Sequence, residues 1–367
     1  MSDTQTYLLR QQAPLVFRSG KPFASSNRDA PQYPSPAAWS GLMQTCRMDA
    51  GLPIDIVAQG VLLVRECEQQ HALFLHRPAD AFPDREQAYY LRMSPALRNE
   101  VERGCDLDPR LAPVLLDDDF VGKPGEAPAF WSMDDYVRWA SGEPLQFAAG
   151  EAWQLPAIAS RVHVRIDRAR DAAEDGQLHR SEAWDCGPHR TEAGFTDHHW
   201  CFTGRGPAGL SPQLVSFGGE RRLSWLEPMA DDALLSIPQP LKERLADSQG
   251  IALTFATPAL FARGWCPGWL DDALTGSPPD HPELRLRLIA VCIPHWQPIS
   301  GWDLQTQSPK PTRRAVPAGA TFWFEVEAGD ASTLWLQSIS DQDKDRRAGF
   351  GLALVRPWNT ELKEIVR

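Results

Sequence analysis

Four side chains of the kinds that bind zinc lie close together between residues 186 and 201. They are Cys186, His189, His198 and Cys201. Structural zinc sites use such ligands at characteristic short spacings, and this cluster matches no common finger or ribbon. Its second pair also falls in a stretch that is typical of a strand. We therefore predict no metal and no other cofactor, and zinc binding stays as the alternative.

The familiar enzyme signatures are absent from the sequence. It contains no GxxxxGK[ST] loop, no GxSxG, no HExxH and no dinucleotide-binding fingerprint after a strand. His163 has the side chain of a general base, but a lone His beside arginines more often makes a hydrogen bond or contacts a phosphate. The acidic run over 117–119 indicates a solvated loop, because adjacent carboxylates repel one another. These observations favour a binding protein over an enzyme.

Glycine turns beside cations are the features that best suit a phosphate. Glycine allows left-handed backbone and close approach of a ligand, so outward-facing amides beside Arg or Lys can cradle an anion. An ordinary structural turn is the alternative at each place. The segments are Gly218-Gly219 followed by Arg221 and Arg222, and Gly349 and Gly351 after Lys344, Arg346 and Arg347.

A third group of cations lies beside tryptophans. Lys310, Arg313 and Arg314 follow Trp296 and Trp302 in the sequence. Cations can contact phosphates while rings stack on bases, so the combination suits a nucleic-acid surface. A solvated loop with core tryptophans is the alternative.

The elements expected near the N-terminus place further cations at the end of a strand. A β-rich run over residues 15–23 bends near its middle and leaves Arg18 and Lys21 on either side of the bend. A helix is expected to begin at Ser35 or Pro36, because apolar residues follow at helical spacing.

The next elements are a predicted hairpin and two short helices. The β-like runs 55–66 and 72–76 are separated by a short polar stretch and predict the hairpin. Helices are expected near 133–141 and 211–216.

An alternating pattern predicts a protruding hairpin over residues 160–185. Polar residues at 161, 163, 165 and 167 alternate with valine and isoleucine, so the polar groups leave one face of a strand. That face is basic on balance, with His163, Arg165 and then Arg168. A loop containing Asp175-Gly176 is expected to turn the chain into the second strand.

Length and composition indicate a two-domain α+β protein. The 367 residues are 43% hydrophobic and 23% charged, with a formal net charge of −11, 32 prolines and 14 tryptophans. A second series of strands begins near residue 251, after a linking stretch at 228–249. The seven dispersed cysteines fit a reducing cytosol. The N-terminus has no basic leader followed by an apolar core and no run of about 18 apolar residues occurs, so we expect a cytoplasmic protein without a membrane partner.

Taken in order, these segments resemble the Cmr subunit-three family of CRISPR RAMP proteins. No resemblance is identified within residues 78–156. The blocks that carry it are LVFRSGKPF, YPSPAAWSGLMQT, HVRIDRARDAAEDGQLHRSE, FGGERR, TPALFARGW, SGWDLQ with KPTRRAVPAGATFWFE, and GFGLALV.

The resemblance implies an α+β fold of two ferredoxin-like (RRM-like) domains with a protruding β-hairpin thumb. The first would span residues 1–228, including an inserted segment at 78–156 and the thumb at about 161–185, and the second 229–367. It implies a non-catalytic subunit of a type III-B ribonucleoprotein that caps the 5′ tag of the guide RNA and docks on the large polymerase-like subunit and an adjacent RAMP backbone subunit. The thumb would meet target RNA. The RNA-binding residues are then expected to be Arg18, Lys21, Ser35, His163, Arg165, Arg168, Gly218, Gly219, Arg221, Arg222, Lys310, Arg313, Arg314, Gly349 and Gly351.

One departure from an RNA-binding composition is the acidity of the chain, with Asp171, Glu174 and Asp175 in the expected thumb loop. Two alternatives stay open. One is a metal-independent, guide-processing endoribonuclease of the same superfamily that uses His163. The other is a protein-only scaffold whose tryptophans and acidic surface bind other subunits.

Overall fold

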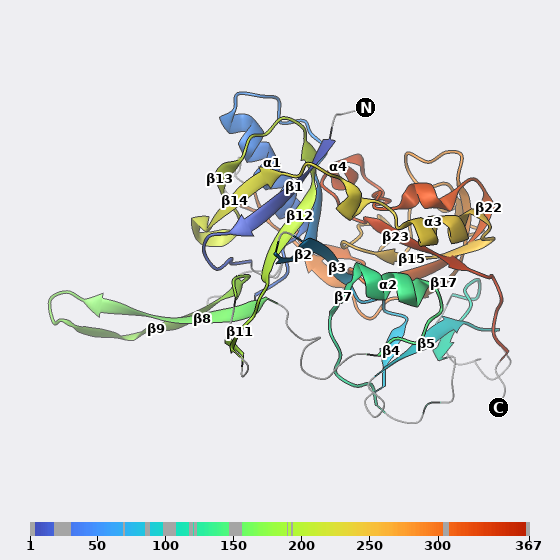
Figure 1. Cartoon of the computed structure of the whole chain (residues 1–367), viewed down its shortest axis with the longest axis horizontal. Coiled ribbons are helices and arrows are strands. Elements are labelled where there is room, and N and C mark those ends of the chain that lie inside the picture. Colours follow the sequence, from blue (N-terminus) through green and yellow to red (C-terminus); the bar gives the residue numbers. More distant parts are fainter. Residues whose placement is uncertain are drawn as a thin grey trace.

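The protein is a mixed α/β structure built mostly of antiparallel sheets, with few helices. The computed structural model describes residues 4–17, 31–68, 70–84, 89–97, 108–116, 120, 123–146, 156–188, 190–191, 194–303 and 308–364. Two sheets lie side by side, and a long two-stranded arm projects away from the first (Figure 1). Among these residues, no helix is both long and apolar enough to cross a membrane.

The first sheet has the strand order β13-β14-β1-β12-β2-β3-β7, and every neighbouring pair is antiparallel. Helix α1 (Pro36–Asp49) connects β1 to β2. The predicted hairpin is confirmed as the pair β2–β3, whereas the helix expected near 211–216 is wrong because β13 pairs there with β14. The strands are β1 (Thr4–Gln11), β2 (Gln59–Cys67), β3 (Gln70–His76), β7 (Phe130–Ser132), β12 (His199–Pro207), β13 (Gln213–Ser216) and β14 (Leu223–Pro228).

Helix α1 covers one face of the first sheet. Its predicted start is confirmed, with Ser35 as the N-cap and Pro36 in the first turn, where the missing N–H of proline costs no helical hydrogen bond. The helix packs closely on the strands because a glycine lies beneath it. A Cβ atom on Gly204 would lie 2.7 Å from a ring atom of the buried Trp39.

The second sheet has the order β16-β17-β22-β15-β23 and is also antiparallel. Its strands are β15 (Gly250–Phe255), β16 (Thr275–Gly276), β17 (Arg285–Cys292), β22 (Thr321–Ala328) and β23 (Ala353–Trp358). The connection from β14 to β15 contains a 3-10 turn at Ala233–Leu235 and helix α3 (Gln239–Ala246). The connection from β22 to β23 contains a 3-10 turn at Ala331–Leu334 and helix α4 (Asp343–Arg347). A further 3-10 turn at Gly219–Arg221 connects β13 to β14 in the first sheet. Short strand pairs are β10 (Arg190–Thr191) with β11 (Gly194–Phe195), β18 (Gln297–Ile299) with β21 (Arg313–Ala315), and β19 (Trp302–Asp303) with β20 (Ser308–Pro309).

One apolar core joins the two sheets. Leu8 and Val64 enter it from the first sheet, and Ile251 and Phe322 enter it from the second. Tyr7, the neighbour of Leu8 on β1, instead packs in the cluster that contains α1. Because successive side chains of a strand point to opposite faces, the central strands of the first sheet are buried on both faces.

The segment 78–156 is tied to the second sheet as well as the first. Asp80 pairs with Arg356 of β23 and accepts a hydrogen bond of 2.9 Å from the Thr321 hydroxyl, with side-chain exposures of 1% and 4% for the pair. The Ala112 N–H donates to the Ile289 carbonyl at 2.8 Å. The helix predicted near 133–141 is confirmed. That helix is α2 (Met133–Ala140), and the segment also contains β4 (Ala81–Pro83), β5 (Tyr90–Pro95), β6 (Val114–Leu116) and β7.

The arm is formed by β8 (Ala157–Asp167) and β9 (Ala172–Asp185), as the alternating pattern predicts. The turn expected at Asp175-Gly176 is wrong, because the chain reverses over residues 168–171. Gly176, with φ of 74°, lies inside β9, where that strand carries extra residues opposite the register shift between Val164 and Ile166. The Asp-Gly pair therefore serves a bulge and not the tip of the hairpin.

Candidate nucleic-acid interface

Two ends of one loop meet beside the glycine turn at 218–219. The Phe17 carbonyl accepts a hydrogen bond of 3.0 Å from the Gln32 N–H, so the chain leaves and returns at one point. Arg18 and Lys21 belong to the sequence between these two residues and lie outside the described residues. Their assignment to an RNA site stays a prediction, but the place where their loop is anchored is defined.

The glycine turn packs on the start of that loop. The Gly219 N–H donates to the Val16 carbonyl at 2.7 Å. Gly218 has φ of 83°, and a Cβ atom there would lie 2.8 Å from the same carbonyl oxygen, so only glycine fits without strain. The rings of Phe17 and Phe217 meet edge to face at 5.0 Å. The structure thus brings together two segments that are about two hundred residues apart in the sequence.

The two arginines after the glycines have different surroundings. Glu220 and Arg221 are both left-handed, with φ of 60° and 51°. Arg222 donates to the Glu220 carboxylate at 2.7 Å, and its side chain is 19% exposed. Arg221 is exposed. Arg221 is therefore the cation that this turn presents to solvent beside residues 16–17.

The N-terminus of α1 follows the returning end of the same loop. Ser35 has extended backbone, its side chain caps no amide, and the first turn of the helix contains no acidic residue. The first amides of a helix lack helical partners and carry the positive end of its dipole, which favours an anion. This end of α1 is suited to a phosphate, and an RNA contact at Ser35 stays a prediction.

A cluster of rings fixes this region to the root of the arm. The Tyr33 ring lies 5.1 Å from His76, 5.2 Å from Phe130 and 6.1 Å from Trp184. Burial lowers the pKa of His76 to about 4, so its ring is neutral near pH 7. Leu15 and Trp184, at the base of the arm, exchange backbone hydrogen bonds of 2.8 Å. The loop ends, the helix start and the arm root therefore form one rigid unit.

The polar face of the arm carries the predicted thumb residues. His163 Nε2 lies 2.7 Å from the Ser181 hydroxyl, and Arg165 pairs with Glu174 at 3.0 Å. Arg168 is exposed in the turn at the tip. Their contact with RNA stays a prediction, and the Glu174 pair offsets part of the positive charge of this face.

The opposite face of the arm is apolar and exposed. Val162, Val164, Ile166 and Leu178 have 67%, 44%, 50% and 62% of their surfaces exposed. Val164 and Leu178 are direct cross-strand partners and so point to the same side. This face is apolar towards the tip of the arm, whereas Arg180, the cross-strand partner of Val162, lies on the same face nearer the root.

The predicted cationic group at 310–314 divides into one structural and two exposed cations. Arg313 makes a double hydrogen bond to the buried Asp345 at 2.7 and 2.6 Å, which raises the pKa of Arg313. The Arg314 guanidinium lies 5.2 Å from the ring of Trp296, which is 55% exposed. Lys310 is exposed. Arg314 with Trp296 forms a platform of the kind on which a base can stack.

Gly349 and Gly351 are packing positions. A Cβ atom on Gly349 would lie 2.9 Å from backbone atoms of Gln59 and Gly60 at the start of β2, and one on Gly351 would lie 2.6 Å from the Ser340 hydroxyl. Both glycines are buried. Close contact with β2 explains Gly349, and close contact with Ser340 and Ala259 explains Gly351, so nothing in their surroundings requires a phosphate.

The four potential zinc ligands do not form a cluster where the structure describes them. Cys186 packs in the core beneath α1, whereas Cys201 packs in the core shared by the sheets, on the other face of β12. His189 lies outside the described residues. Burial raises the pKa of both thiols, so the thiolate forms that bind zinc are disfavoured. No group of three or more His, Cys, Asp or Glu side chains in the described parts of the chain could hold a metal ion.

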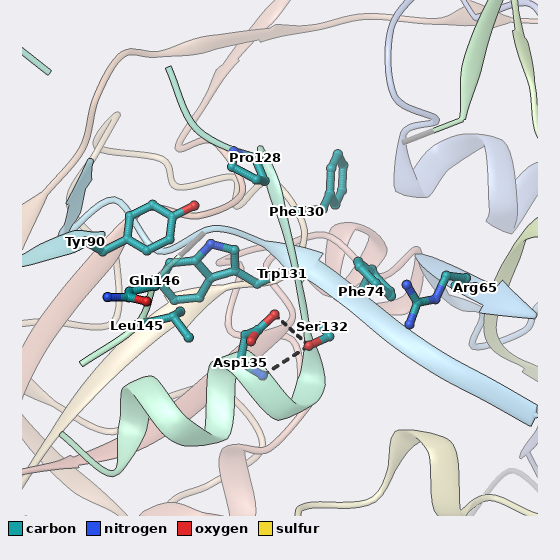
Figure 2. A pocket seen from close by; sticks show the side chains of 10 residues that line it. All are labelled: Arg65, Phe74, Tyr90, Pro128, Phe130, Trp131, Ser132, Asp135, Leu145 and Gln146. Carbon is teal, nitrogen blue, oxygen red and sulfur yellow. Dashed lines mark hydrogen bonds between the residues drawn. The ribbon is translucent and has the colours of Figure 1, made fainter. Parts of the chain in front are cut away.

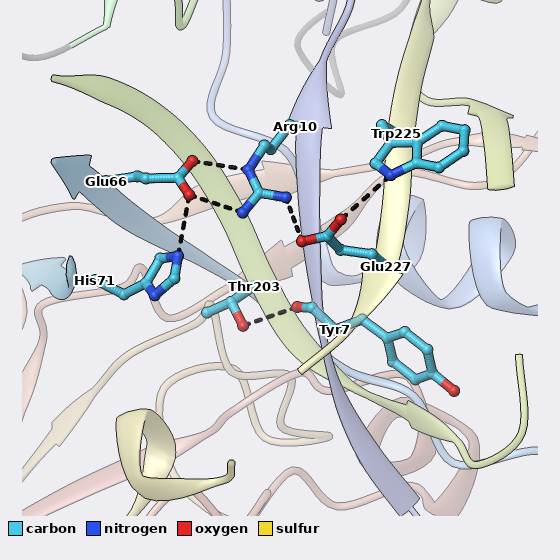
Figure 3. Close-up of polar contacts among 7 residues, drawn as sticks. All are labelled: Tyr7, Arg10, Glu66, His71, Thr203, Trp225 and Glu227. Carbon is cyan, nitrogen blue, oxygen red and sulfur yellow. Dashed lines mark hydrogen bonds and ion pairs between the residues drawn. The ribbon is translucent and has the colours of Figure 1, made fainter. Parts of the chain in front are cut away.

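Arg10 on the first sheet lies at the centre of a network of ion pairs (Figure 3). Arg10 makes two hydrogen bonds of 2.7 Å to Glu66 and one to Glu227. His71 lies 3.2 Å from Glu66, and the Trp225 indole donates to Glu227 at 3.2 Å. The hydrogen bonds to Glu66 raise the pKa of Arg10, and those from Arg10 lower the pKa of Glu66. With two carboxylates on one guanidinium, this patch does not favour a phosphate.

A pocket of about 200 Å³ opens along β7, the edge strand of the first sheet (Figure 2). No motif in the sequence predicts this pocket, because its residues come from five separate segments. The one sequence signal is the density of aromatic residues at 130–131 and 136–139. The lining residues are Arg65, Phe74, Tyr90, Pro128, Phe130, Trp131, Ser132, Asp135, Leu145 and Gln146.

Comparison with known proteins gives one family and a distant similarity to solved structures, two of which are described here. Residues 7–358 match the family described as CRISPR-associated protein (Cas_Cmr3). No curated protein matches the sequence. A cryo-EM structure of the type III-B Cmr-beta bound to cognate target RNA and AMPPnP contains a chain with 14% identity and a TM-score of 0.46, and the match covers 87% of this chain and 86% of that one. A second structure, of the type III-B Cmr-beta bound to cognate target RNA, gives 13% identity and a TM-score of 0.45 with the same coverage.

Proposed function

The chain belongs to the Cas_Cmr3 family of CRISPR-associated proteins, and from that premise we propose that it is a non-catalytic RNA-binding subunit of a type III-B CRISPR ribonucleoprotein. In this proposal it caps the 5′ tag of the guide RNA. It docks on the large polymerase-like subunit and on an adjacent RAMP backbone subunit, in the cytoplasm.

The observation that carries the RNA site is that two anion-suited features, the glycine turn at 218–219 and the start of α1, are connected through the two ends of one segment. Gly219 contacts Val16, Phe17 contacts Gln32, and the uncapped start of α1 at Ser35 follows directly. Backbone amides at a glycine turn and at a helix start can bind phosphates without reading sequence. Arg221 adds an exposed cation. We name this region the loop-base site and assign it to the guide backbone.

The proposal includes a ferredoxin-like fold for each sheet. In that fold the first strand lies between the third and fourth, and the second strand pairs with the third. The orders β14-β1-β12-β2 and β23-β15-β22-β17 both follow this rule. The first domain then comprises residues 1–228 with the insertion at 78–156, and the second comprises residues 229–367.

The arm is proposed to meet target RNA through its polar face. His163 and Arg168 lie along that face and at the tip, and the arm projects well beyond the sheets (Figure 1). Its root is anchored by Leu15 and Trp184 to the loop-base site. Guide and target contacts would then be held in a fixed relation.

The test is charge reversal at the loop-base site in the full chain. RNA that co-purifies with the chain is resynthesised, and its affinity is measured over a series of salt concentrations. The double variant Arg221→Glu/Arg222→Glu is expected to bind roughly tenfold more weakly or worse, with a salt slope reduced by about one per lost phosphate contact. Arg18→Glu/Lys21→Glu is expected to act in the same direction.

A matched control reverses two exposed lysines that do not belong to the loop-base site. Lys242→Glu/Lys344→Glu changes the net charge equally, and its residues lie in α3 and α4. It is expected to change RNA affinity only slightly. Unchanged affinity and salt slope in both site variants, with folding intact by circular dichroism, would contradict the proposed site.

A further inference from the structure

The strand pair β18–β21 has one buried and one exposed face. Ile299 and Ala315 lie on the buried face, in a small apolar core. Arg314 is the cross-strand partner of Pro298, and Trp296 comes two residues before that proline. Because successive side chains of a strand point to opposite faces, Trp296 and Arg314 share the face that is turned away from the core. The Arg314 guanidinium carbon lies 5.2 Å from the centre of the Trp296 ring, in agreement with this placement.

The Trp296 side chain can be reached from solvent. The residue has 55% of its surface exposed even with Arg314 beside it, and His295 before it is also exposed. An indole ring and a guanidinium are both planar, and both stack on nucleic-acid bases. We name this pair the Trp296–Arg314 platform.

The charge around the platform is positive in an acidic chain. Residues 293–316 contain three cations, Lys310, Arg313 and Arg314, and a single acidic residue, Asp303, whereas the whole chain has a net charge of −11. The buried Asp345 neutralises Arg313 through its double hydrogen bond. Lys310 and Arg314 are exposed, and neither has an ion-pair partner among the described residues. Exposed cations without carboxylate partners favour a ligand that carries phosphates.

A short series of contacts connects the platform to the loop-base site. Gly319 follows Arg314 by five residues, a length of chain that spans at most about 18 Å. A Cβ atom on Gly319 would lie 2.6 Å from the Arg77 carbonyl oxygen and 3.8 Å from the His76 Cβ atom. The His76 ring lies 5.1 Å from that of Tyr33, which belongs to the ring cluster of the loop-base site. The platform is therefore held in a fixed position relative to that site.

We propose that the Trp296–Arg314 platform stacks on one unpaired base of the RNA whose backbone is held at the loop-base site. The proposal rests on the proposed function and adds a second subsite to it. Stacking uses the face of a base and leaves its hydrogen-bonding edge free. Proteins commonly bind single-stranded RNA by stacking splayed bases on aromatic rings and arginine planes. A ligand with phosphates and a planar group satisfies both the exposed cations and the exposed indole.

The test combines changes in single nucleotides with changes in the platform. The RNA that co-purifies with the full chain is synthesised with one abasic nucleotide, which is moved through each position in turn. For the unaltered protein, one position is expected to lower affinity roughly fivefold or more, the scale of one stacked base. Trp296→Ala should lower affinity for intact RNA to a similar extent, and the abasic change at that same position should then cause less than about a twofold further loss.

Two matched variants separate stacking from other effects. Trp296→Phe keeps an aromatic ring and should retain affinity within about twofold and the sensitivity to that abasic position. Arg314→Gln should reduce the effect of the same position, whereas Arg285→Gln, which removes an exposed arginine of β17, should leave the abasic profile unchanged. Since Trp296 is exposed, its variants are expected to fold, which circular dichroism checks.

The opposing outcomes are distinct. Affinity that falls in Arg221→Glu/Arg222→Glu but not in Trp296→Ala would overturn the platform and leave the proposed function standing. Loss of affinity in Trp296→Ala without reduced sensitivity to any abasic position would overturn it too. Loss of a co-purifying protein from Trp296→Ala, with RNA affinity unchanged, would show a protein contact in its place. Recovery of no RNA would overturn both proposals.

Discussion

The glycine turns at 218–219 and 349–351 look alike in the sequence and differ in the structure. Each combines glycines with nearby arginines, and each suggested a phosphate cradle. The first is exposed beside a loop base, with Arg221 in solvent. The second is buried against β2. Glycines beside cations in a sequence therefore indicate that some group lies close to the backbone of the turn. Only the fold decides whether that group is a ligand or another part of the same chain.

The cations near the second turn show the same contrast. Arg346 donates to Asp280, Asp343 and two backbone carbonyls, and Arg347 donates to Asp55 at 2.6 Å. These bonds attach α4 to neighbouring segments. Arg346 and Arg347 of the second region hold the protein together, while Arg221 in the first remains on the surface.

Adding one methyl group at the second turn tests the difference between the two turns most directly. Gly349→Ala places a Cβ atom 2.9 Å from backbone atoms of β2 at a φ of 84°, and the backbone there cannot yield easily. We expect a loss of about 3 kcal/mol in the free energy of unfolding, measured by urea denaturation. A loss below about 1 kcal/mol would mean that the two sheets are not in contact at this point.

Mild acid should weaken the first region through His76. The folded-state pKa of about 4 lies below the ordinary value of 6.5, so the unfolded state takes up the proton first. Stability is then constant above pH 6.5 and falls between pH 6.5 and 4. Because part of the residue is exposed, we expect a loss of about 2 kcal/mol over this range. His76→Phe should reduce this pH dependence, and equal slopes in both proteins would exclude His76 as its source.

Removing the partner of Arg313 should test whether that cation is structural. Asp345→Asn breaks a double hydrogen bond to a side chain that is 37% exposed, so solvent screens part of the effect. We expect a loss of about 1 kcal/mol in stability, against a few tenths for Asp343→Asn, whose carboxylate is 69% exposed. Equal effects of the two changes would argue against a special role for the Arg313 pair.

The smallest effect on stability is expected at the first turn. A Cβ atom on Gly219 would lie 3.4 Å from the Val16 carbonyl oxygen, an ordinary contact, and its φ is not left-handed. Gly219→Ala should change stability by less than about 0.5 kcal/mol but weaken RNA binding several-fold, because the methyl stands on the exposed turn. A stability loss as large as that of Gly349→Ala would remove the distinction between the two turns.

Local patterns predicted the elements well where a period or a cap was strong. The helix after Ser35, the helix at 133–140, the β2–β3 hairpin and the arm all follow from spacing within a short window. Residues 211–216 are expected to be helical, whereas residues 213–216 form a strand because they pair with β14, which follows after a short turn. The Asp175-Gly176 pair was read as a hairpin turn, while the strand uses its left-handed glycine for a bulge.

The candidate site was predictable in its parts and not in its assembly. Ser35 and Gly218 were singled out separately, but their meeting depends on the hydrogen bonds at Val16 and Phe17. The burial of Gly349 and the use of Arg313 by Asp345 depend on contacts between distant segments. The pocket along β7 shows no sequence motif, because its lining residues come from separate segments.

The most direct measurement is to co-express the tagged chain with its neighbouring genes, purify it, sequence the RNA that accompanies it and identify its protein partners. The proposed function predicts short RNAs that share a constant 5′ end, together with a large polymerase-like protein. It also predicts that Arg221→Glu/Arg222→Glu recovers much less of that RNA. Protein recovered free of RNA, or with RNA that lacks a common 5′ end, would contradict it.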